Sequence, residues 1–225
     1  MFETKLDQAR VDEIANLALR VGGLVFDLSC VERATPGPHG RLESDTDHTV
    51  SVAFAAVTIA EYYGLDKGKT ALRALAHDTP EAITGDIKTH YPDDQLLQFK
   101  RQVDEAGEAE LVSQFGNTAA RWILENIAGY ERGNSPEDIV TRLADKMVRA
   151  GVHILDGCTS LRASGMTVEE HDLNVAMTYK RMAKDMEAFP EVAAAWRALD
   201  DRVRAILAAP PDADEGASFI RNNAV

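Results

Sequence analysis

The sequence predicts an all-α fold. Apolar residues recur at helical spacing through most of the chain, and capping signals of the Ser-x-x-Asp or Thr-x-x-Glu type precede several of these stretches. No alternating strand pattern rises above background. The 225 residues suffice for one domain with a large core. We expect a single domain over residues 1–208 and a flexible, Pro-rich and acidic tail over residues 209–225.

Two helices separated by a loop are expected in the first part of the chain. The first helix carries apolar residues at helical spacing until Gly22-Gly23, which we expect to interrupt it. Residues 34–40 have the Pro and Gly composition of a loop. Ser44 and Asp47 then form a cap that opens a helix running to Tyr63.

The middle of the chain predicts one short and one long helical stretch. A helix is expected over residues 69–76, and Pro80 begins a further turn that Gly85 ends. Residues 93–115 are polar with only a modest apolar face, which predicts a peripheral helix, and the helical pattern resumes over residues 118–127.

The last third begins with a strong helix start. Ser135-Pro136-Glu137-Asp138 combines a cap, a proline at the first position and acids in the first turn. The helix that follows is apolar on more than one side, which predicts a central position. Residues 167–170 form a capping box for the next helix, Phe189-Pro190 breaks it, and residues 192–207 form a last amphipathic helix.

Composition excludes several classes of partner. The chain has 24 Lys and Arg against 37 Asp and Glu, a net charge of −13, and no basic run, which argues against binding of duplex nucleic acid. Cys30 and Cys158 lie far apart, so neither a disulfide framework nor a thiolate metal site is indicated. Because the sequence has no signal-peptide pattern and no run of about 18 apolar residues, we expect a cytoplasmic protein without membrane contact.

An imidazole and a carboxylate stand side by side at His77-Asp78, directly after a hydrophobic run. We expect Leu72, Leu75 and Ala76 to be buried, so that His77 and Asp78 emerge from a core face. Such polar groups tolerate burial only when something compensates them. A divalent metal ion would do so.

Two more candidate ligands lie elsewhere in the chain. His48 falls on the apolar stripe of its helix, where a lone histidine is more often a core residue. Asp145 points toward the apolar side of its helix, and the alternative to a metal is an ion pair with Lys146 or Arg149. Lys146 is about 100° away around the helix axis, so we do not expect it to share the direction of Asp145.

Taken together, these residues form a mixed nitrogen and oxygen donor set: His48, His77, Asp78 and Asp145. Such a set suits Mn, Co, Fe, Ni or Zn better than Ca or Mg. A six-coordinate ion with four protein ligands keeps two positions for water and a substrate oxygen, which suits hydrolysis.

The order of these motifs resembles that of the HD-domain metal-dependent phosphohydrolases. The match spans about residues 28–156 and consists of an arginine, Glu43-Ser44-x-x-Asp47-His48, His77-Asp78-x-x-Glu81-x-x-Thr84-Gly85-Asp86 and Ala144-Asp145-Lys146. Within this family the chain looks most like the 5'-deoxynucleotidases of the YfbR type and related small dNTP phosphohydrolases. The resemblance implies an HD-domain helical bundle, a divalent metal ion (Mn, Co, Zn, Fe, Ni or Mg) and a homodimer.

The resemblance also implies roles for three further residues. Glu81 and Asp86 occupy the positions of the family's catalytic acids, although Glu81 at a helix start and Asp86 in a turn also have purely structural explanations. Arg33 stands where the family's phosphate-binding arginine stands, with Arg41 as its rival. The family's tryptophan after that arginine is replaced by Ala34, which bears on discrimination between deoxyribose and ribose.

The expected function is hydrolytic removal of the 5'-phosphate from (deoxy)nucleoside monophosphates, small-molecule substrates. The first alternative is a triphosphohydrolase that releases triphosphate from a dNTP, which requires several cationic groups, and the sequence near the motifs offers few. The second is a non-catalytic nucleotide-binding HD module, against which the presence of both Glu81 and Asp86 argues.

Overall fold

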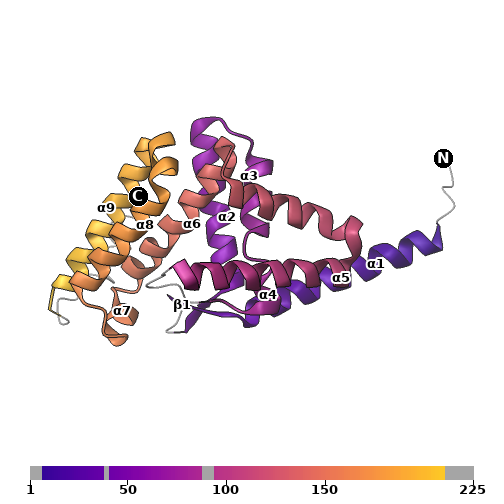
Figure 1. The fold of residues 1–225 in the computed structure, drawn as a ribbon, viewed down its shortest axis with the longest axis horizontal. Helices are drawn as coiled ribbons and strands as arrows, with labels where there is room; N and C mark the ends of the chain where they lie inside the picture. The colour runs from indigo at the N-terminus through magenta and orange to yellow at the C-terminus, as the bar shows by residue number, and fades with distance from the viewer. Residues whose placement is uncertain (1–6, 38–40, 88–93, 211–225) are drawn as a thin grey trace, which may run out of the picture.

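The computed structural model describes residues 7–37, 41–87 and 94–210, and it is a helical bundle with a short β-hairpin (Figure 1). Its elements are α1 (Gln8–Cys30), β1 (Glu32–Pro36), β2 (Leu42–Ser44), α2 (Asp45–Tyr63), α3 (Lys67–Ala76), α4 (Glu81–Thr84), α5 (Asp94–Arg132), α6 (Pro136–Leu155), α7 (Thr159–Ala163), α8 (Val168–Ala188) and α9 (Pro190–Ala208). The all-α prediction is confirmed. The predicted tail beyond residue 210 lies outside the described residues.

The helix starts predicted from capping signals are confirmed. Ser44, Ser135 and Thr167 each accept a hydrogen bond from the backbone N–H three residues later, and the acid at that position binds the cap in return. Gly64 ends α2 in the left-handed conformation, with φ of 67°. No helix among the described residues is long and apolar enough to cross a bilayer.

The predicted break at Gly22-Gly23 is wrong, because α1 continues to Cys30. A glycine inside a helix costs only about 1 kcal/mol. Leu24 and Leu28, one turn apart beyond the glycines, are buried against the rest of the protein, and their burial outweighs that cost.

The predicted loop at residues 34–40 contains a strand. β1 pairs with β2 in an antiparallel hairpin whose register shifts between Glu32 and Pro36. Gly37 N–H donates to Arg41 O at 2.8 Å. A Cβ at Gly37 would lie 2.8 Å from Leu42 O, so only glycine allows the two backbones to approach this closely.

The long helix α5 doubles back on itself at Gly116, which has a φ of 74° and a ψ of 157° (Figure 1). The prediction that its first arm is peripheral is wrong. Leu111 and Phe115 are buried with Leu24 and Ile123 in one hydrophobic cluster. The arm also packs closely on α4, since a Cβ at Gly107 would lie 3.0 Å from Pro80.

Helix α6 is central, as predicted, and packs against α2, α3, α5, α8, α9 and β1. Small side chains let α2, α3 and α6 approach closely, and Val52, Ala56, Ala74 and Ala144 are fully buried there. On α3 the buried residues include Ala74 and Ala76, whereas Leu72 and Leu75 are 44% and 43% exposed, contrary to our expectation. The face of α3 that packs in the core is therefore formed by small residues such as Ala74 and Ala76.

Candidate metal centre

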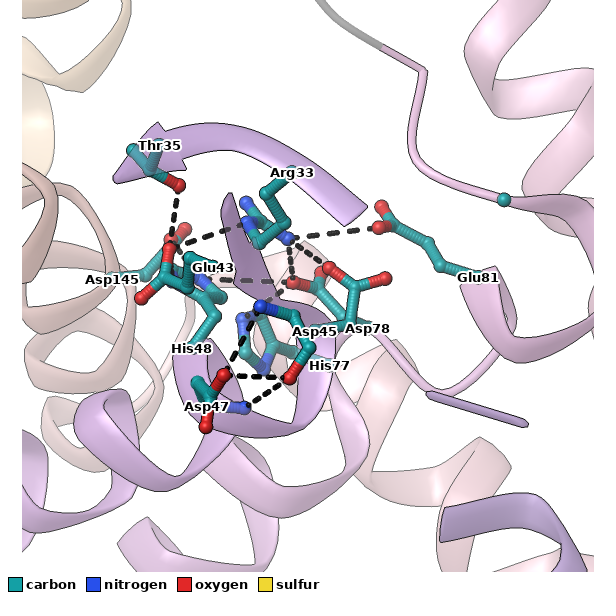
Figure 2. A network of polar contacts seen from close by, with 12 residues as sticks. Arg33, Thr35, Glu43, Asp45, Asp47, His48, His77, Asp78, Glu81 and Asp145 are labelled. Atoms are coloured by element: carbon teal, nitrogen blue, oxygen red, sulfur yellow. Dashed lines mark hydrogen bonds and ion pairs between the residues drawn. The ribbon is translucent and has the colours of Figure 1, made fainter. Parts of the chain in front are cut away.

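The four predicted ligands converge from three helices (Figure 2). His48 lies in α2, His77 caps the C-terminus of α3, Asp78 follows it, and Asp145 lies in the middle of α6. His77 Nε2 lies 3.2 Å from Asp78 Oδ2, and His48 Nε2 lies 3.7 Å from the same oxygen and 3.2 Å from Asp145 Oδ1. Residues 97 positions apart along the chain thus share one buried site.

The tautomer of His77 is fixed by the backbone. Its Nδ1 lies 2.7 Å from Ala74 O, and because a carbonyl oxygen only accepts, Nδ1 carries the proton. Nε2 is then left with its lone pair, fully buried and without a hydrogen bond to any described residue. A buried imidazole lone pair that faces carboxylates is the arrangement of a metal ligand.

The second imidazole faces an acceptor as well. His48 Nδ1 lies 3.7 Å from Glu43 Oε2, and Thr35 Oγ1 donates to that same oxygen at 2.6 Å. When the proton of His48 is on Nδ1, its Nε2 and Asp145 Oδ1 are two acceptors facing each other across 3.2 Å. A cation between them removes this conflict, so the donor set fits a divalent metal ion.

Asp145 is held by two donors. Tyr130 Oη, from the second arm of α5, and Lys146 Nζ at 2.6 Å both donate to Oδ2, which leaves Oδ1 for the centre. Burial opposes ionisation, but Lys146 and both imidazoles keep the pKa of Asp145 well below its ordinary value. The expectation for Lys146 was wrong, because its long side chain bends back to its neighbour although the two Cα–Cβ bonds diverge.

A cluster of three carboxylates lies beside the histidines and surrounds Arg33 (Figure 2). Arg33 Nη1 lies 2.7 Å from Asp45 Oδ1, 2.9 Å from Asp78 Oδ2 and 3.6 Å from Glu81 Oε2. Asp45 is the first residue of α2 and is completely buried. Asp45 Oδ2 and Glu81 Oε2 accept no hydrogen bond from the described residues, so one guanidinium serves three acids.

The two candidate arginines have different environments. The contacts of Arg33 with Asp45, Asp78 and Glu81 raise its pKa further above the ordinary value, even though burial opposes the charge. Arg41 instead pairs with Asp47 at 2.7 Å and is 54% exposed, away from the centre. Arg33 is therefore the arginine that the fold brings to the centre.

Glu81 is buried between two cations. Lys100 Nζ, from the first arm of α5, donates to Glu81 Oε1 at 2.9 Å. Burial and the charge of Asp78 raise the pKa of Glu81 to about 10, against the opposing effect of Lys100 and Arg33. Glu81 is therefore under two opposing influences, burial among acids and two nearby cations.

A cavity of about 440 Å³ opens onto the centre. Its lining includes all seven predicted site residues: Arg33, His48, His77, Asp78, Glu81, Asp86 and Asp145. Ala34 lines it as well, and Asp86 is half-buried at its wall. Lys88 and His90, two basic residues that follow Asp86 in the sequence and could line the phosphate entrance, lie outside the described residues.

Sequence reasoning missed three residues of the centre: Asp45, Tyr130 and Lys100. Asp45 lies inside the motif around His48, but only its side-chain contact with Arg33 distinguishes it from an ordinary helix-start acid. Tyr130 and Lys100 come from α5 and lie 15 and 19 residues along the chain from Asp145 and Glu81, and no local pattern marks them. Only the reversal of α5 brings both to the centre.

Comparison with known proteins adds a family and a fold. The family model of the HD domain matches residues 27–192. A crystal structure of a protein from Magnetospirillum magnetotacticum MS-1, described as a predicted metal-dependent phosphohydrolase, is similar with a TM-score of 0.67 and 20% sequence identity, over 89% of this chain and 99% of that chain. At this identity the likeness concerns the fold.

Two archaeal structures are more distant. A conserved hypothetical protein from Pyrococcus furiosus has a TM-score of 0.45 and 18% identity, over 81% of this chain and 98% of its own. The PH0347 protein from Pyrococcus horikoshii OT3 has a TM-score of 0.47 and 21% identity, over 87% and 99%. No curated protein sequence matches the chain. Because the family model covers most of its length, including the histidines and acids of the centre, the chain belongs to the HD-domain family.

Proposed function

We propose that this protein is a metal-dependent phosphohydrolase that removes the 5'-phosphate from nucleoside monophosphates, with deoxynucleotides as the preferred class. The observation that carries the proposal is the convergence of His48, His77, Asp78 and Asp145 beside Arg33 and Glu81 at one cavity. Membership of the HD-domain family supports the reaction class, as does the fold shared with the Magnetospirillum protein described as a predicted metal-dependent phosphohydrolase.

Four side chains are proposed to hold the metal ion. His48, His77, Asp78 and Asp145 would hold one divalent ion, which supplies charge neutralisation at the phosphoryl group and promotes attack by water. Tyr130 and Lys146 orient Asp145, and the carbonyl of Ala74 orients His77. These outer contacts fix the direction of the ligands before any ion binds.

Arg33 is placed to bind the phosphate of the substrate. Its contacts with Asp45, Asp78 and Glu81 all run through Nη1, which leaves Nη2 for substrate oxygens. A guanidinium fixed on one side offers the other side in a defined orientation, which suits the planar recognition of phosphate.

Glu81 is the group best placed to move a proton. It lies on the cavity wall beside the centre, buried, with Lys100 holding one oxygen and the other oxygen facing Arg33. Such a carboxyl can donate a proton to the leaving oxygen or accept one from water. Asp86, farther along the wall, is assigned to contact with the sugar or the leaving oxygen.

The charge of this cavity favours a monophosphate over a triphosphate. Its acidic lining residues (Asp78, Glu81, Asp86, Asp104, Glu105, Glu108, Glu131 and Asp145) outnumber its basic ones (Arg33, Lys100, Arg101, Lys146 and Arg149). Two of the basic groups, Lys100 and Lys146, are already paired with acids. One phosphate beside the metal and Arg33 can be compensated here, whereas a chain of phosphates would meet carboxylates.

Product analysis tests the proposal. Metal-stripped protein is resupplied with Mn or Co and incubated with matched dNMP, NMP and dNTP substrates, and Asp145→Ala protein serves as the blank. We expect inorganic phosphate from the monophosphates, and the dNMP to NMP ratio measures what Ala34 does to sugar selection. Absence of phosphate release with every metal would refute the proposal.

A further inference from the structure

Glu43 is a buried carboxylate beside the metal centre that takes no part in the proposed hydrolysis. It lies in β2 and is only 3% exposed. Arg33, Thr35 and His48 around it line the cavity, whereas Glu43 does not, so a substrate in the cavity does not touch it. A carboxylate tolerates such burial only when neighbouring groups compensate it, and those groups indicate what it does.

The β-hairpin fixes the position of one oxygen of Glu43. Arg33 and Thr35 are two positions apart on β1, which is the spacing of side chains on one face of a strand. Thr35 Oγ1 donates to Glu43 Oε2 at 2.6 Å, and Arg33 Nε lies 3.9 Å from the same oxygen (Figure 2). One strand thus supplies both a hydrogen-bond donor and a positive charge to the acid of the other strand.

The same oxygen faces the imidazole of His48. Oε2 of Glu43 lies 3.7 Å from Nδ1, whereas Nε2 faces the centre, 3.2 Å from Asp145 Oδ1. At 3.7 Å the contact with Nδ1 is electrostatic rather than a hydrogen bond. Because a carboxylate attracts an N–H group and repels a lone pair, it favours the form of the ring with the proton on Nδ1. The lone pair of His48 is then on Nε2 and points to the centre.

The two histidines of the centre are oriented by different kinds of acceptor. Nδ1 of His77 lies 2.7 Å from the backbone carbonyl oxygen of Ala74, which no substitution removes. Nδ1 of His48 faces the side chain of Glu43 instead. Acceptors in this position orient metal-binding imidazoles, and their loss typically weakens metal binding about 10- to 100-fold. Glu43 therefore has the place beside His48 that Ala74 has beside His77.

We propose that Glu43 is a positioning residue, which orients His48 toward a bound divalent ion, and that Thr35 holds Glu43 in this position. This role rests on the proposed function only through the assignment of His48 as a metal ligand. A purely structural Glu43, which only ties the two strands together through Thr35, would stabilise the fold without affecting metal affinity.

Cobalt binding by the metal-stripped full chain distinguishes the two roles of Glu43. Kd is measured by competition with a chelator, and the visible absorption spectrum of the bound ion reports the ligand geometry. Glu43→Gln keeps the size of the side chain and removes its charge, so we expect Kd to rise about 10- to 100-fold and the spectrum to change. A structural role alone would lower the melting temperature and leave Kd and the spectrum as in the wild type, and that result would overturn the proposal.

Asp104→Asn is the matched control for the loss of negative charge near the centre. Asp104 lines the cavity and pairs with Lys100 at 3.2 Å. Because Asp104 pairs with Lys100 rather than with an imidazole, we expect a rise in Kd well below that of Glu43→Gln. Equal rises in the two variants would reduce the effect of Glu43 to its charge and overturn the proposal.

Thr35→Val tests the position of Glu43 without any change of charge. Valine has nearly the shape of threonine, but it lacks the hydroxyl that donates to Glu43 Oε2. We expect Kd for cobalt to rise as in Glu43→Gln, by a smaller factor. If Glu43→Gln does not fold, Thr35→Val decides, since a raised Kd supports the proposal and a wild-type Kd overturns it.

Measurement without substrate keeps this test separate from that of the proposed function. A wild-type protein that binds cobalt but releases no phosphate from any monophosphate contradicts the proposed function and leaves the comparison at Glu43 valid. An active wild-type enzyme with the same Kd as Glu43→Gln contradicts the role of Glu43 alone.

Discussion

The histidine cluster of the centre (His48, His77 and Asp145) and its carboxylate cluster (Asp45, Asp78 and Glu81) lie against each other, but the protein treats them differently. In the histidine cluster, acceptor atoms face one another, and His77 Nε2 has no donor among the described residues. In the carboxylate cluster, Arg33 and Lys100 supply positive charge from within the chain.

The two clusters therefore differ in the source of the positive charge that compensates them, a metal ion for the histidine cluster and side chains for the carboxylate cluster. In the histidine cluster, Lys146 and Tyr130 contact Oδ2 of Asp145, whereas His77 Nε2 faces the centre without a donor among the described residues, so function should be lost when a ligand is removed. In the carboxylate cluster, Asp78 is itself a proposed ligand, but Asp45 and Glu81 are compensated by Arg33 and Lys100, so changes at these two acids should affect turnover and stability while the metal remains bound. Three predictions test this division, in order of decreasing effect, and a fourth, smaller one concerns a carboxylate outside the centre.

The largest effect is expected from Asp145→Ala. Loss of this ligand should lower metal affinity by more than the roughly 100-fold that typifies loss of an outer contact, and activity should disappear with the metal. Metal content after dialysis, measured by mass spectrometry, checks this. Asp185→Ala is the matched control, since Asp185 is also a buried carboxylate with a basic partner but does not line the cavity of the metal centre. If the Asp145 variant retained its metal in full, Asp145 would not be a ligand.

Glu81→Gln should separate turnover from metal binding. The substitution keeps the size of the side chain and removes its acid and base chemistry, so kcat should fall about 100- to 10,000-fold. Metal content should stay at the wild-type level, because Glu81 belongs to the cluster that the chain neutralises itself. A parallel loss of metal would instead make Glu81 a ligand.

Arg33→Gln should affect binding and stability together. Without the guanidinium, Asp45, Asp78 and Glu81 repel one another in a buried place, and breaking a buried ion pair typically costs about 3 kcal/mol of the free energy of unfolding. KM for a phosphate ester should rise about 10-fold, with the metal retained. In Arg33→Lys, the positive charge remains and only the planar guanidinium group is lost. Compared with Arg33→Gln, this variant should regain more of the lost stability than of the lost substrate affinity, which KM reports. Stability measured in urea and steady-state kinetics distinguish the two effects.

The smallest effect is expected outside the centre, at Asp138. Its carboxylate caps α6 and accepts from Arg73 Nε at 2.6 Å, and these contacts outweigh burial and lower its pKa. A carboxyl with a lowered pKa in the folded state stabilises it above the unfolded pKa of about 4 and loses that contribution as the pH falls through the folded pKa.

Asp138→Asn should therefore lower the free energy of unfolding by about 1–3 kcal/mol at pH 7 and flatten its fall below pH 4. Urea unfolding between pH 2 and 7 measures this. Glu137→Gln, which removes the more exposed pair with Lys69, is the control and should cost about 1 kcal/mol or less. A variant as acid-sensitive as the wild type would exclude Asp138 as the titrating group.

The sequence allowed the prediction of features that local chemistry decides. The caps at Ser44, Ser135 and Thr167 are visible from residues three positions apart, and the helices follow from them. The strand at Glu32–Pro36 was missed because its pairing with β2 outweighs a Pro- and Gly-rich composition. The break at Gly22-Gly23 was wrong because long-range packing of Leu24 and Leu28 outweighs propensity.

The candidate site, too, was predictable from the sequence only in part. The histidines and acids of the motifs come together as their order suggested, and their roles stay predictions until the variants are measured. The contacts of Arg33 with Asp45 and of Glu81 with Lys100 depend on how β1 and α5 pack, which no spacing along the chain reveals. Two basic residues of the cavity, Arg101 and Arg149, were not identified from the sequence, because they reach it through tertiary packing, although acids still outnumber bases in its lining.

The ends of two helices meet at the centre with opposite polarity. Helix α2 begins at Asp45, so its partially positive N-terminus lies beside a carboxylate. Helix α3 ends before His77, so its partially negative C-terminus lies beside an imidazole that is proposed to bind a cation. The peptide dipoles thus favour an anion at the start of α2 and a cation at the end of α3, independently of the side chains. A transplant of the ligands onto another scaffold would lose this contribution unless it also reproduced where these two helices start and stop.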